Sequence, residues 1–232
     1  MNTKKVALFG DSILKGVVLD TNGRYRFADI DWNSIEKRLN VDIVNKSKFG
    51  CEIKKGGKIL SDSMSRESFD VAVIEYGGND SDFCWGEVAA TPFERHTSKT
   101  EVGEFEVRLE YMVSVLQDKG VKVVLMSLPP IDAERYFDWI SQKDEQKQKN
   151  IMAFLGDVSR INRYQEMYSN AIVQVAFKKQ CDLVDVRKKF LQSDDFKGLM
   201  CLDGIHPNEK GQREIISAFV EYFNDTALAK AN

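Results

Sequence analysis

Five short runs of β-branched and other apolar residues recur along the chain, and segments with helical periodicity separate them. Each run is nearly continuous in apolar residues, whereas a strand with one face in water alternates apolar and polar side chains. The runs therefore predict strands that are buried on both faces, as in a parallel sheet covered by helices on both sides. The predicted strands span residues 6–9, 41–44, 71–76, 121–126 and 183–186.

Three of the separating segments place apolar residues at the spacing of one helix face. The first face ends before Gly120 and the second before Lys178 and Lys179, which are typical residues for the C-terminus of a helix. Strands that alternate with helices favour an α/β fold of three layers with right-handed crossovers. The three faces consist of Phe105, Leu109, Met112, Val113 and Leu116; of Ile161, Tyr164, Tyr168, Ala171, Ile172 and Val175; and of Ile215, Ile216, Phe219, Val220 and Phe223.

Two stretches, residues 81–103 and 131–157, do not follow this alternation. Each follows the carboxyl end of a predicted strand, where open α/β sheets bind their ligands, so we expect both to form walls of a pocket. Because no internal repeat and no Pro- or Ser-rich linker divides the chain, residues 1–232 are expected to form one domain with these two insertions. Their aromatic residues either line a subsite or anchor the insertions, and they are Trp85, Tyr136, Phe137 and Trp139.

Charge and cysteine content exclude several classes of protein. The 33 Lys and Arg are balanced by 36 Asp and Glu, whereas binding to phosphate backbones needs a clustered positive surface, so no nucleic-acid partner is expected. No apolar run approaches the roughly 20 residues of a membrane span, and run 6–9 is far shorter than the core of a signal peptide. The four cysteines form no C-x-x-C pair, which predicts reduced, mostly buried thiols and no zinc ribbon. We therefore expect a cytoplasmic protein without a membrane span.

The first candidate for chemistry is Ser12, which follows the first predicted strand in the sequence Gly10-Asp11-Ser12. A glycine at the end of the strand allows a tight turn, and the serine after it would lie at the edge of the sheet where the pocket is expected. Such a serine can act as a nucleophile if a base reaches it. Taken alone, a serine in a polar turn or a helix N-cap is the commoner interpretation.

The candidate base is His206, which lies near the other end of the chain, three residues after Asp203. A carboxylate at this spacing can accept the Nδ1–H of the histidine, and Nε2 is then free to take a proton from a serine. Asn208 is a candidate N-cap of the helix that follows. The chain has only two histidines. The other, His96, lies in a polar insertion and is expected to be a solvent-exposed loop residue.

Two further segments follow predicted strands and offer hydrogen-bond donors. Gly77-Gly78-Asn79-Asp80 comes directly after the third strand, and the Asn79 amide can donate to a developing oxyanion without bringing a net charge. Gly50 follows the second strand, and its N–H is a candidate for a second donor. Each segment alone could equally be an ordinary turn.

Together, these four segments resemble the SGNH (GDSL-type) hydrolase superfamily, and the resemblance spans nearly the whole chain. It implies a flavodoxin-like α/β/α sandwich with a five-stranded parallel sheet, and a hydrolase that acts on small-molecule esters with no metal ion and no cofactor. At the matching positions, Ser12 would be the nucleophile, His206 the general base and then acid, and Asp203 the residue that orients His206. Ser127-Leu128-Pro129-Pro130 after the fourth strand is a further local match.

The same resemblance implies three donors for an oxyanion hole. These are the N–H of Ser12, the N–H of Gly50 and the side chain of Asn79. Asp11 and Asp80 also fall on motif positions, but roles in stabilising turns suit them better than catalysis.

The two insertions depart from the family pattern and are expected to decide the substrate. We expect a serine esterase that forms an acyl-enzyme and prefers short, acetyl-type acyl groups on a carbohydrate alcohol, because the chain lacks a long apolar lid segment. A thioesterase, a lysophospholipase and a broad-specificity arylesterase of the same superfamily remain alternatives. The non-enzymatic alternative is a flavodoxin-like binding module, but the carboxylate of Asp11 lies where a phosphate cradle would be needed.

Overall fold

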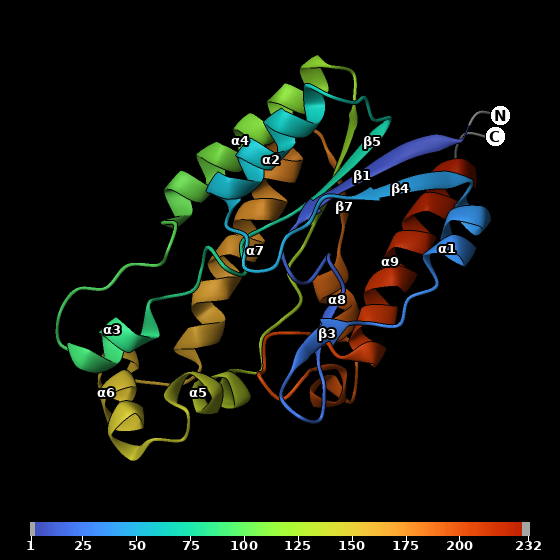
Figure 1. Cartoon of the computed structure of the whole chain (residues 1–232). Helices are drawn as coiled ribbons and strands as arrows, with labels where there is room; N and C mark the ends of the chain where they lie inside the picture. Colours follow the sequence, from blue (N-terminus) through green and yellow to red (C-terminus); the bar gives the residue numbers. More distant parts are fainter. Residues whose placement is uncertain (1–2, 229–232) are drawn as a thin grey trace.

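Five parallel strands form the central layer of the structure, which is a computed structural model that describes residues 3–228 (Figure 1). Their order in the sheet is β4-β1-β5-β6-β7. This is the flavodoxin-like order, in which the first strand of the sheet lies between the second and the third, and the remaining strands follow in sequence. The predicted three-layer α/β/α sandwich is therefore confirmed. The strands are β1 (Lys4–Gly10), β4 (Val41–Asn45), β5 (Val71–Glu75), β6 (Lys122–Met126) and β7 (Asp182–Val184).

The last predicted strand is wrong at its end. Residues 183–186 were expected to be extended, but β7 ends at Val184 and Val186 begins helix α8 (Val186–Leu191). The reason is Asp185, whose side chain accepts a hydrogen bond from the Lys188 N–H and so caps the helix. Apolarity alone did not distinguish the end of the strand from the start of the helix, because Val186 is buried as the first residue of α8 just as it would be in a central strand.

Helices cover both faces of the sheet, as the near-continuous apolarity of the strands predicted (Figure 1). Along each strand, alternate residues pack into opposite layers; in β1, Ala7 and Phe9 face one core and Val6 and Leu8 the other. One layer consists of α2 (Ile53–Met64), α4 (Val102–Asp118) and α7 (Arg160–Lys178). The other consists of α1 (Trp32–Leu39), α8 and α9 (Glu209–Leu228), with a short 3-10 helix η1 (Phe196–Leu199) beside them.

A two-stranded antiparallel hairpin was not predicted. It consists of β2 (Val17–Leu19) and β3 (Tyr25–Phe27), and it follows directly after the turn that contains Ser12. An ion pair between Arg26 and Glu209 and a hydrogen bond from the Leu19 N–H to the Cys201 sulfur fix it against the C-terminal part of the chain.

The two insertions contain helices that pack against each other. Residues 81–103 contain α3 (Trp85–Ala90), and residues 131–157 contain α5 (Ala133–Ser141) and α6 (Glu145–Leu155). Their apolar side chains, among them Phe83, Ile151 and Leu155, form a third cluster beside the carboxyl edge of the sheet. Throughout residues 3–228, every helix is too short or too polar to cross a lipid bilayer.

Candidate active site

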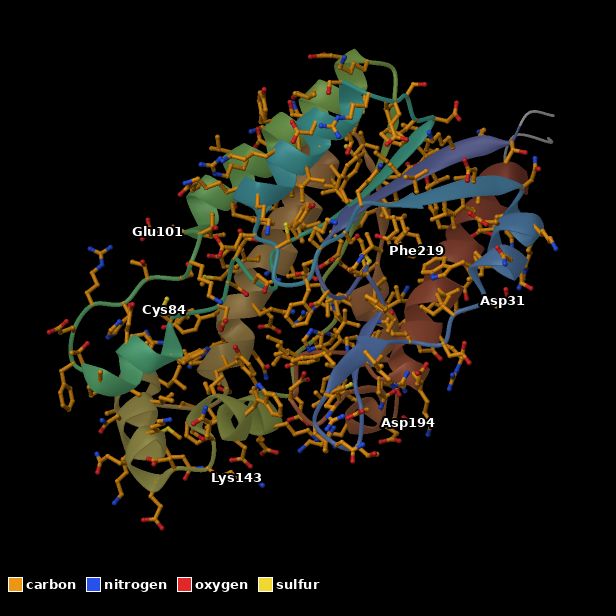
Figure 2. The ribbon with its side chains drawn as sticks, viewed as in Figure 1. Asp31, Cys84, Glu101, Lys143, Asp194 and Phe219 are labelled. Carbon is orange, nitrogen blue, oxygen red and sulfur yellow. The ribbon has the colours of Figure 1, made fainter. Side chains whose placement is uncertain are left out.

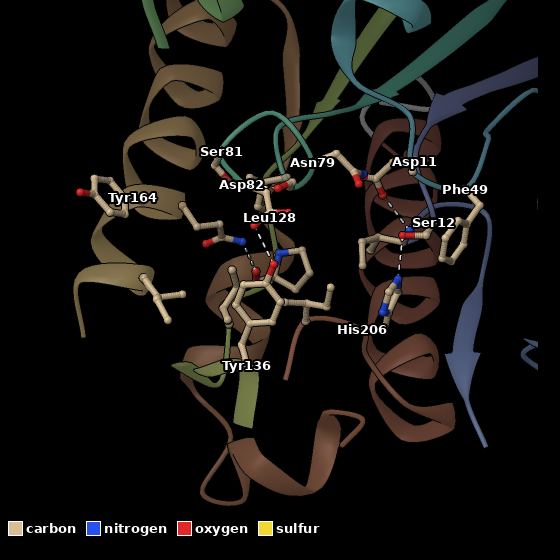
Figure 3. A pocket seen from close by; sticks show the side chains of 18 of the residues that line it. Asp11, Ser12, Phe49, Asn79, Ser81, Asp82, Leu128, Tyr136, Tyr164 and His206 are labelled. Atoms are coloured by element: carbon tan, nitrogen blue, oxygen red, sulfur yellow. Dashed lines mark hydrogen bonds between the residues drawn. The ribbon is translucent and has the colours of Figure 1, made fainter. Parts of the chain in front are cut away.

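The structure brings together three residues from the two ends of the chain, and Figure 3 shows two of them, Ser12 and His206. Ser12 Oγ lies 2.8 Å from His206 Nε2, and His206 Nδ1 lies 2.7 Å from Asp203 Oδ2. All three side chains are buried. If the carboxylate accepts the Nδ1–H, Nε2 is left to accept the hydroxyl proton of Ser12, which is the arrangement needed to activate a serine as a nucleophile.

The turn after β1 places Ser12 at the carboxyl edge of the sheet. A Cβ atom at Gly10 would lie 2.8 Å from Glu75 Oε2 and 2.9 Å from the Glu75 carbonyl oxygen, so only glycine fits where β1 passes β5. Asp11 Oδ1 accepts a hydrogen bond of 2.8 Å from the Ile13 N–H, and the Val17 N–H donates to the Ser12 carbonyl. These bonds hold the serine on a tight turn between strand and hairpin.

The loop before α9 holds Asp203 and His206. Asp203 Oδ1 accepts from the N–H groups of Ile205 and His206, each at 3.1 Å, so the carboxylate fastens its own loop as well as the imidazole. Burial by itself would raise the pKa of the Asp203 carboxyl, but the hydrogen bonds and the charge of His206 outweigh it and the pKa is lowered. Asp203 is therefore ionised at neutral pH. As predicted, Asn208 caps α9, because its Oδ1 accepts from the N–H groups of Lys210 and Gly211.

Helix α5 of the second insertion supports this loop. The Asp132 N–H donates to the Gly204 carbonyl at 2.8 Å. Gly204 has a φ of +75°, and a Cβ atom there would lie 2.5 Å from the Asp132 carbonyl oxygen. The contact between insertion and loop is thus possible only for glycine.

The predicted oxyanion donors lie on the cavity that contains Ser12. Gly50 and Asn79 both line it, together with Ser12 itself. Within residues 3–228, the backbone N–H groups of Ser12 and Gly50 donate to no other residue. The Asn79 amide donates one hydrogen bond, of 2.9 Å, to Asp11 Oδ2, which fixes its orientation and leaves its second N–H.

Two buried carboxyl groups lie beneath this cluster. The Asp11 N–H donates to Glu75 Oε2 at 3.2 Å, and Glu75 Oε1 has no hydrogen-bond partner among the described residues. Burial raises the pKa of Glu75 well above its usual range, and the neighbouring Asp11 carboxyl raises it further. Burial also raises the pKa of Asp11, although the hydrogen bond from Ile13 opposes the shift. The Glu75 carboxyl therefore holds a proton more readily than an exposed glutamic acid.

Asp80, the other acidic motif residue, fastens a helix. Its two carboxylate oxygens lie 3.0 and 3.2 Å from the Ile53 N–H at the start of α2, and burial raises its pKa to about 6. Asp11 and Asp80 both bind backbone N–H groups of neighbouring turns, which is the geometry expected of turn-stabilising residues.

The cavity has a volume of about 200 Å³ and extends away from Ser12 between the insertions (Figure 3). We call its far part the inner pocket, which is lined by Leu128, Pro129, Tyr136, Ile161 and Tyr164. A polar cluster closes its end: the Tyr136 hydroxyl donates to Asp82 Oδ1 at 2.6 Å, and Trp85 Nε1 donates to the same oxygen at 2.7 Å. Lys99 pairs with the other carboxylate oxygen of Asp82 at 2.8 Å. Trp85 and Tyr136 thus both line the cavity and anchor the insertions.

Three exposed aromatic side chains form one group, and two of them, Tyr25 and Phe49, contact the His206 ring. We call Tyr25, Phe49 and Trp139 the aromatic rim. The ring centroids of Tyr25 and Phe49 lie 5.2 and 6.0 Å from that of the His206 imidazole, and Tyr25 also contacts Phe49 at 5.1 Å and Trp139 at 6.5 Å. Burial and the nearby Asp203 carboxylate raise the pKa of the Tyr25 hydroxyl. These rings shield the histidine from part of the solvent.

The remaining candidates lie away from this cluster. His96 is half-buried, and its Nε2 lies 2.8 Å from the Thr91 carbonyl oxygen within its own insertion. The four cysteines are all free, as expected, but the prediction that they are mostly buried is only half right: Cys51 and Cys201 are buried, Cys181 is half-buried, and Cys84 is exposed beside α3 (Figure 2). Phe137 packs against the cluster between the insertions and does not line the cavity.

Tyr25, Phe49 and Glu75 were not identified as site residues from the sequence. Two signals were available. Asn22-Gly23 between two short apolar runs is a hairpin signal that would have placed Tyr25 near Ser12, and Glu75 is a carboxyl group inside an otherwise apolar strand. No sequence signal distinguished Phe49 from other loop aromatics.

The sequence profile of the GDSL-like Lipase/Acylhydrolase family matches residues 8–214. The chain belongs to this family. The match covers every segment that holds the cluster described above, from the turn after β1 to the start of α9. The prediction of a GDSL-type ester hydrolase is therefore confirmed at the level of the family.

Individual GDSL proteins are distant in sequence. "GDSL esterase/lipase CPRD49" of Arabidopsis thaliana is 21% identical over 90% of this chain and 74% of its own length. Among solved structures, the lipase/acylhydrolase from Enterococcus faecalis is 19% identical and covers 96% of both chains with a TM-score of 0.66. The acetyl xylan esterase AlAXEase is 24% identical, with a TM-score of 0.63 over 94% of this chain and 98% of its own. These structures share the fold of this GDSL chain.

Proposed function

We propose that the protein is a serine esterase that hydrolyses carboxylic esters through an acyl-enzyme intermediate. Ser12 is the nucleophile, His206 the general base and acid, and Asp203 the partner that orients His206. The observation that carries the proposal is the unbroken chain of hydrogen bonds from Ser12 Oγ through both nitrogens of His206 to the ionised Asp203 carboxylate. Such a chain, in a buried site next to an open cavity, supports the proposal because it can move a proton off the serine.

The cycle has two halves, and in each of them His206 accepts one proton and then passes it on to another group. First, His206 Nε2 takes the Ser12 proton as Oγ bonds to the ester carbonyl carbon, and the tetrahedral intermediate then expels the alcohol, which receives that proton. Next, water loses a proton to His206 as its oxygen attacks the acyl-enzyme, and Ser12 regains the proton when the acid leaves.

The oxyanion of both tetrahedral intermediates would be held by three donors: the N–H groups of Ser12 and Gly50 and the amide of Asn79. The two backbone donors have no other acceptor within residues 3–228, and Asn79 is already oriented by Asp11. Donors that are fixed before the reaction stabilise the developing charge without reorganisation.

The substrate that we propose is an ester of a short, acetyl-type acyl group, with a carbohydrate as the preferred alcohol. The cavity of about 200 Å³ is smaller than the roughly 300–1,000 Å³ of pockets for drug-sized ligands, and Tyr136 closes its inner end. The similarity in fold to an acetyl xylan esterase is consistent with this choice. An acyl-length series from acetyl to decanoyl tests it, and peak activity at eight or more carbons would instead favour a thioesterase or lysophospholipase.

The test of the catalytic assignment is hydrolysis of p-nitrophenyl acetate by the purified protein and by its Ser12→Ala variant. We expect the wild type to hydrolyse the ester and the variant to be inactive, and we expect a fluorophosphonate to label the wild type at Ser12. Full activity of Ser12→Ala would refute the assignment. Since no step requires a metal ion or a cofactor, dialysis against EDTA should leave the rate unchanged.

We further propose that the chain is one domain whose insertions, residues 81–103 and 131–157, form walls of the cavity that contains Ser12. The packing of α3 against α6 beside α7 supports this, because neither insertion has a core of its own. A single cooperative transition in urea would agree with it. A cytoplasmic location also remains our proposal, and the four free cysteines agree with a reducing compartment.

A further inference from the structure

The position of His206 assigns the two sides of the cavity to the two halves of an ester, if the proposed function is correct. The departing alcohol takes its proton from His206 Nε2, so it must lie on the side of Ser12 where the imidazole lies. The acyl group then extends in the opposite direction. Figure 3 shows Phe49 next to Ser12 and His206 on one side, whereas Leu128 and Tyr136 of the inner pocket lie on the other.

The alcohol side is therefore the side of the aromatic rim. Its three rings come from segments that are far apart in the sequence: Tyr25 from the β2–β3 hairpin, Phe49 from the loop after β4, and Trp139 from α5. Tyr25 joins them, with centroid distances of 5.1 Å to Phe49 and 6.5 Å to Trp139. Three separate elements thus contribute to one aromatic surface, and two of its rings, Tyr25 and Phe49, also line the cavity.

We propose that the aromatic rim is the subsite for the leaving alcohol and that it receives a sugar ring. Tyr25, Phe49 and Trp139 are 41%, 52% and 40% exposed although each contacts a neighbouring ring, so the rim is an open platform and not a closed pocket. A molecule that rests on such a platform keeps its far side in water. A sugar suits this position because its C–H face packs on aromatic rings while its hydroxyl groups stay hydrated.

The inner pocket is a poor place for the same sugar. Its polar groups are already paired with one another, since the Tyr136 hydroxyl and Trp85 Nε1 both donate to Asp82, and Asp82 also pairs with Lys99. Inserting a sugar there would strip water from its hydroxyl groups without replacing their hydrogen bonds. The rest of its lining is mostly apolar, with Leu128, Pro129 and Ile161, which suits an acyl group.

The experiment compares two acetate esters that differ only in the alcohol, an acetylated methyl xylopyranoside and ethyl acetate, and adds phenyl acetate as an aryl ester. We measure KM for all three with the wild type, Trp139→Ala and Tyr25→Leu. Trp139 is the sharper position because its ring contacts Tyr25 and not His206. The matched control is Phe177→Ala, an aromatic truncation at an 89% exposed position near the C-terminal end of α7.

Loss of one aromatic contact should raise KM for the sugar ester roughly two- to tenfold. KM of the rim variants for ethyl acetate should stay at the wild-type value, and so should every KM of the control variant. The readout is the ratio of the two KM values, which cancels any common effect of Tyr25→Leu on His206. An unchanged ratio in both rim variants would overturn the subsite, and so would an effect confined to phenyl acetate. Absence of all ester hydrolysis by the wild type would instead refute the proposed function.

Discussion

Replacing Glu75 by glutamine removes an ionisable group from a fully buried position beneath the active site and keeps its shape. The glutamine oxygen can still accept the Asp11 N–H that now donates to Glu75 Oε2 at 3.2 Å. Burial and the Asp11 carboxyl raise the pKa of Glu75 well above the ordinary value of 4.5. The sign follows from linkage: below pH 4.5 the group is protonated in both folded and unfolded protein, and above it only the unfolded chain ionises freely. The wild type therefore loses stability as the pH rises from 4.5 through the folded-state pKa, and Glu75→Gln does not.

The size of the effect follows from the cost of keeping one proton bound. The difference in free energy of unfolding between Glu75→Gln and the wild type should increase by about 1.4 kcal/mol per pH unit above this ordinary pKa, until the folded-state pKa is reached. Urea unfolding followed by tryptophan fluorescence, in half-unit steps from pH 4.5 to pH 7, measures this slope. Asp11 is present in both proteins, and burial, the main cause of its raised pKa, is common to both and cancels in the difference.

Glu67→Gln is the matched control, because the pKa of Glu67 is shifted in the opposite direction from that of Glu75. Glu67 lies near the surface and pairs with Lys5 and Lys46, and its hydrogen bonds with Lys46 and Lys5 lower its pKa. Its contribution to stability is fully present above the ordinary pKa of 4.5 and is lost only as the pH falls below that value, so the curves of this variant and of the wild type should run parallel between about pH 5 and pH 7. If the Glu75→Gln and wild-type curves run parallel from pH 4.5 to pH 7, Glu75 ionises normally and the description of the buried carboxyl pair is wrong.

Three further substitutions test the site. Asn79→Ala should lower kcat for p-nitrophenyl acetate by about 10² to 10³ with little change in KM, because it removes a proposed oxyanion donor; an effect confined to KM would contradict that role. Asp203→Asn should lower kcat about 10⁴-fold, as loss of the orienting carboxylate does in comparable triads. Stopped assays across pH 6–9 measure this loss, and wild-type turnover of the variant would contradict the role of Asp203. Gly204→Ala should lower the free energy of unfolding by more than the ~1–2 kcal/mol of left-handed strain alone, because its Cβ meets the Asp132 carbonyl. The control is Gly23→Ala, with a similar φ and no atom within 4 Å of the added Cβ, and equal losses in the two variants would refute the clash.

The sheet could be predicted from the sequence because its central strands are buried on both faces. Val71 to Ile74, for example, is apolar at every position, whereas a strand with one face in water would carry polar residues on that face. The positions of Ser12, Asn79 and Gly50 followed at once, since parallel strands bring their carboxyl ends to one edge. The spacing of Asp203 and His206 within one loop supplied the rest of the cluster.

The aromatic rim could not be predicted in the same way, because its geometry depends on contacts between segments without a shared periodicity. Tyr25 lies in a three-residue strand whose burial pattern is exposed throughout, so no alternation marks it. Trp139 lies on α5, whose first turn is bonded through Asp132 to the loop at Gly204. Neither Tyr25 nor Trp139 carries a local signal that it contacts the other ring.

The hydrogen bond between the Asp132 N–H and the Gly204 carbonyl has a consequence for how this enzyme can be diversified. The segment that lines the cavity is bonded to the loop that holds Asp203 and His206, so the two cannot be exchanged as independent modules. A graft of the insertion of another family member should keep Asp132 and Gly204 and replace only residues 133–157. Loop libraries that cross this boundary would be expected to lose turnover before they change selectivity.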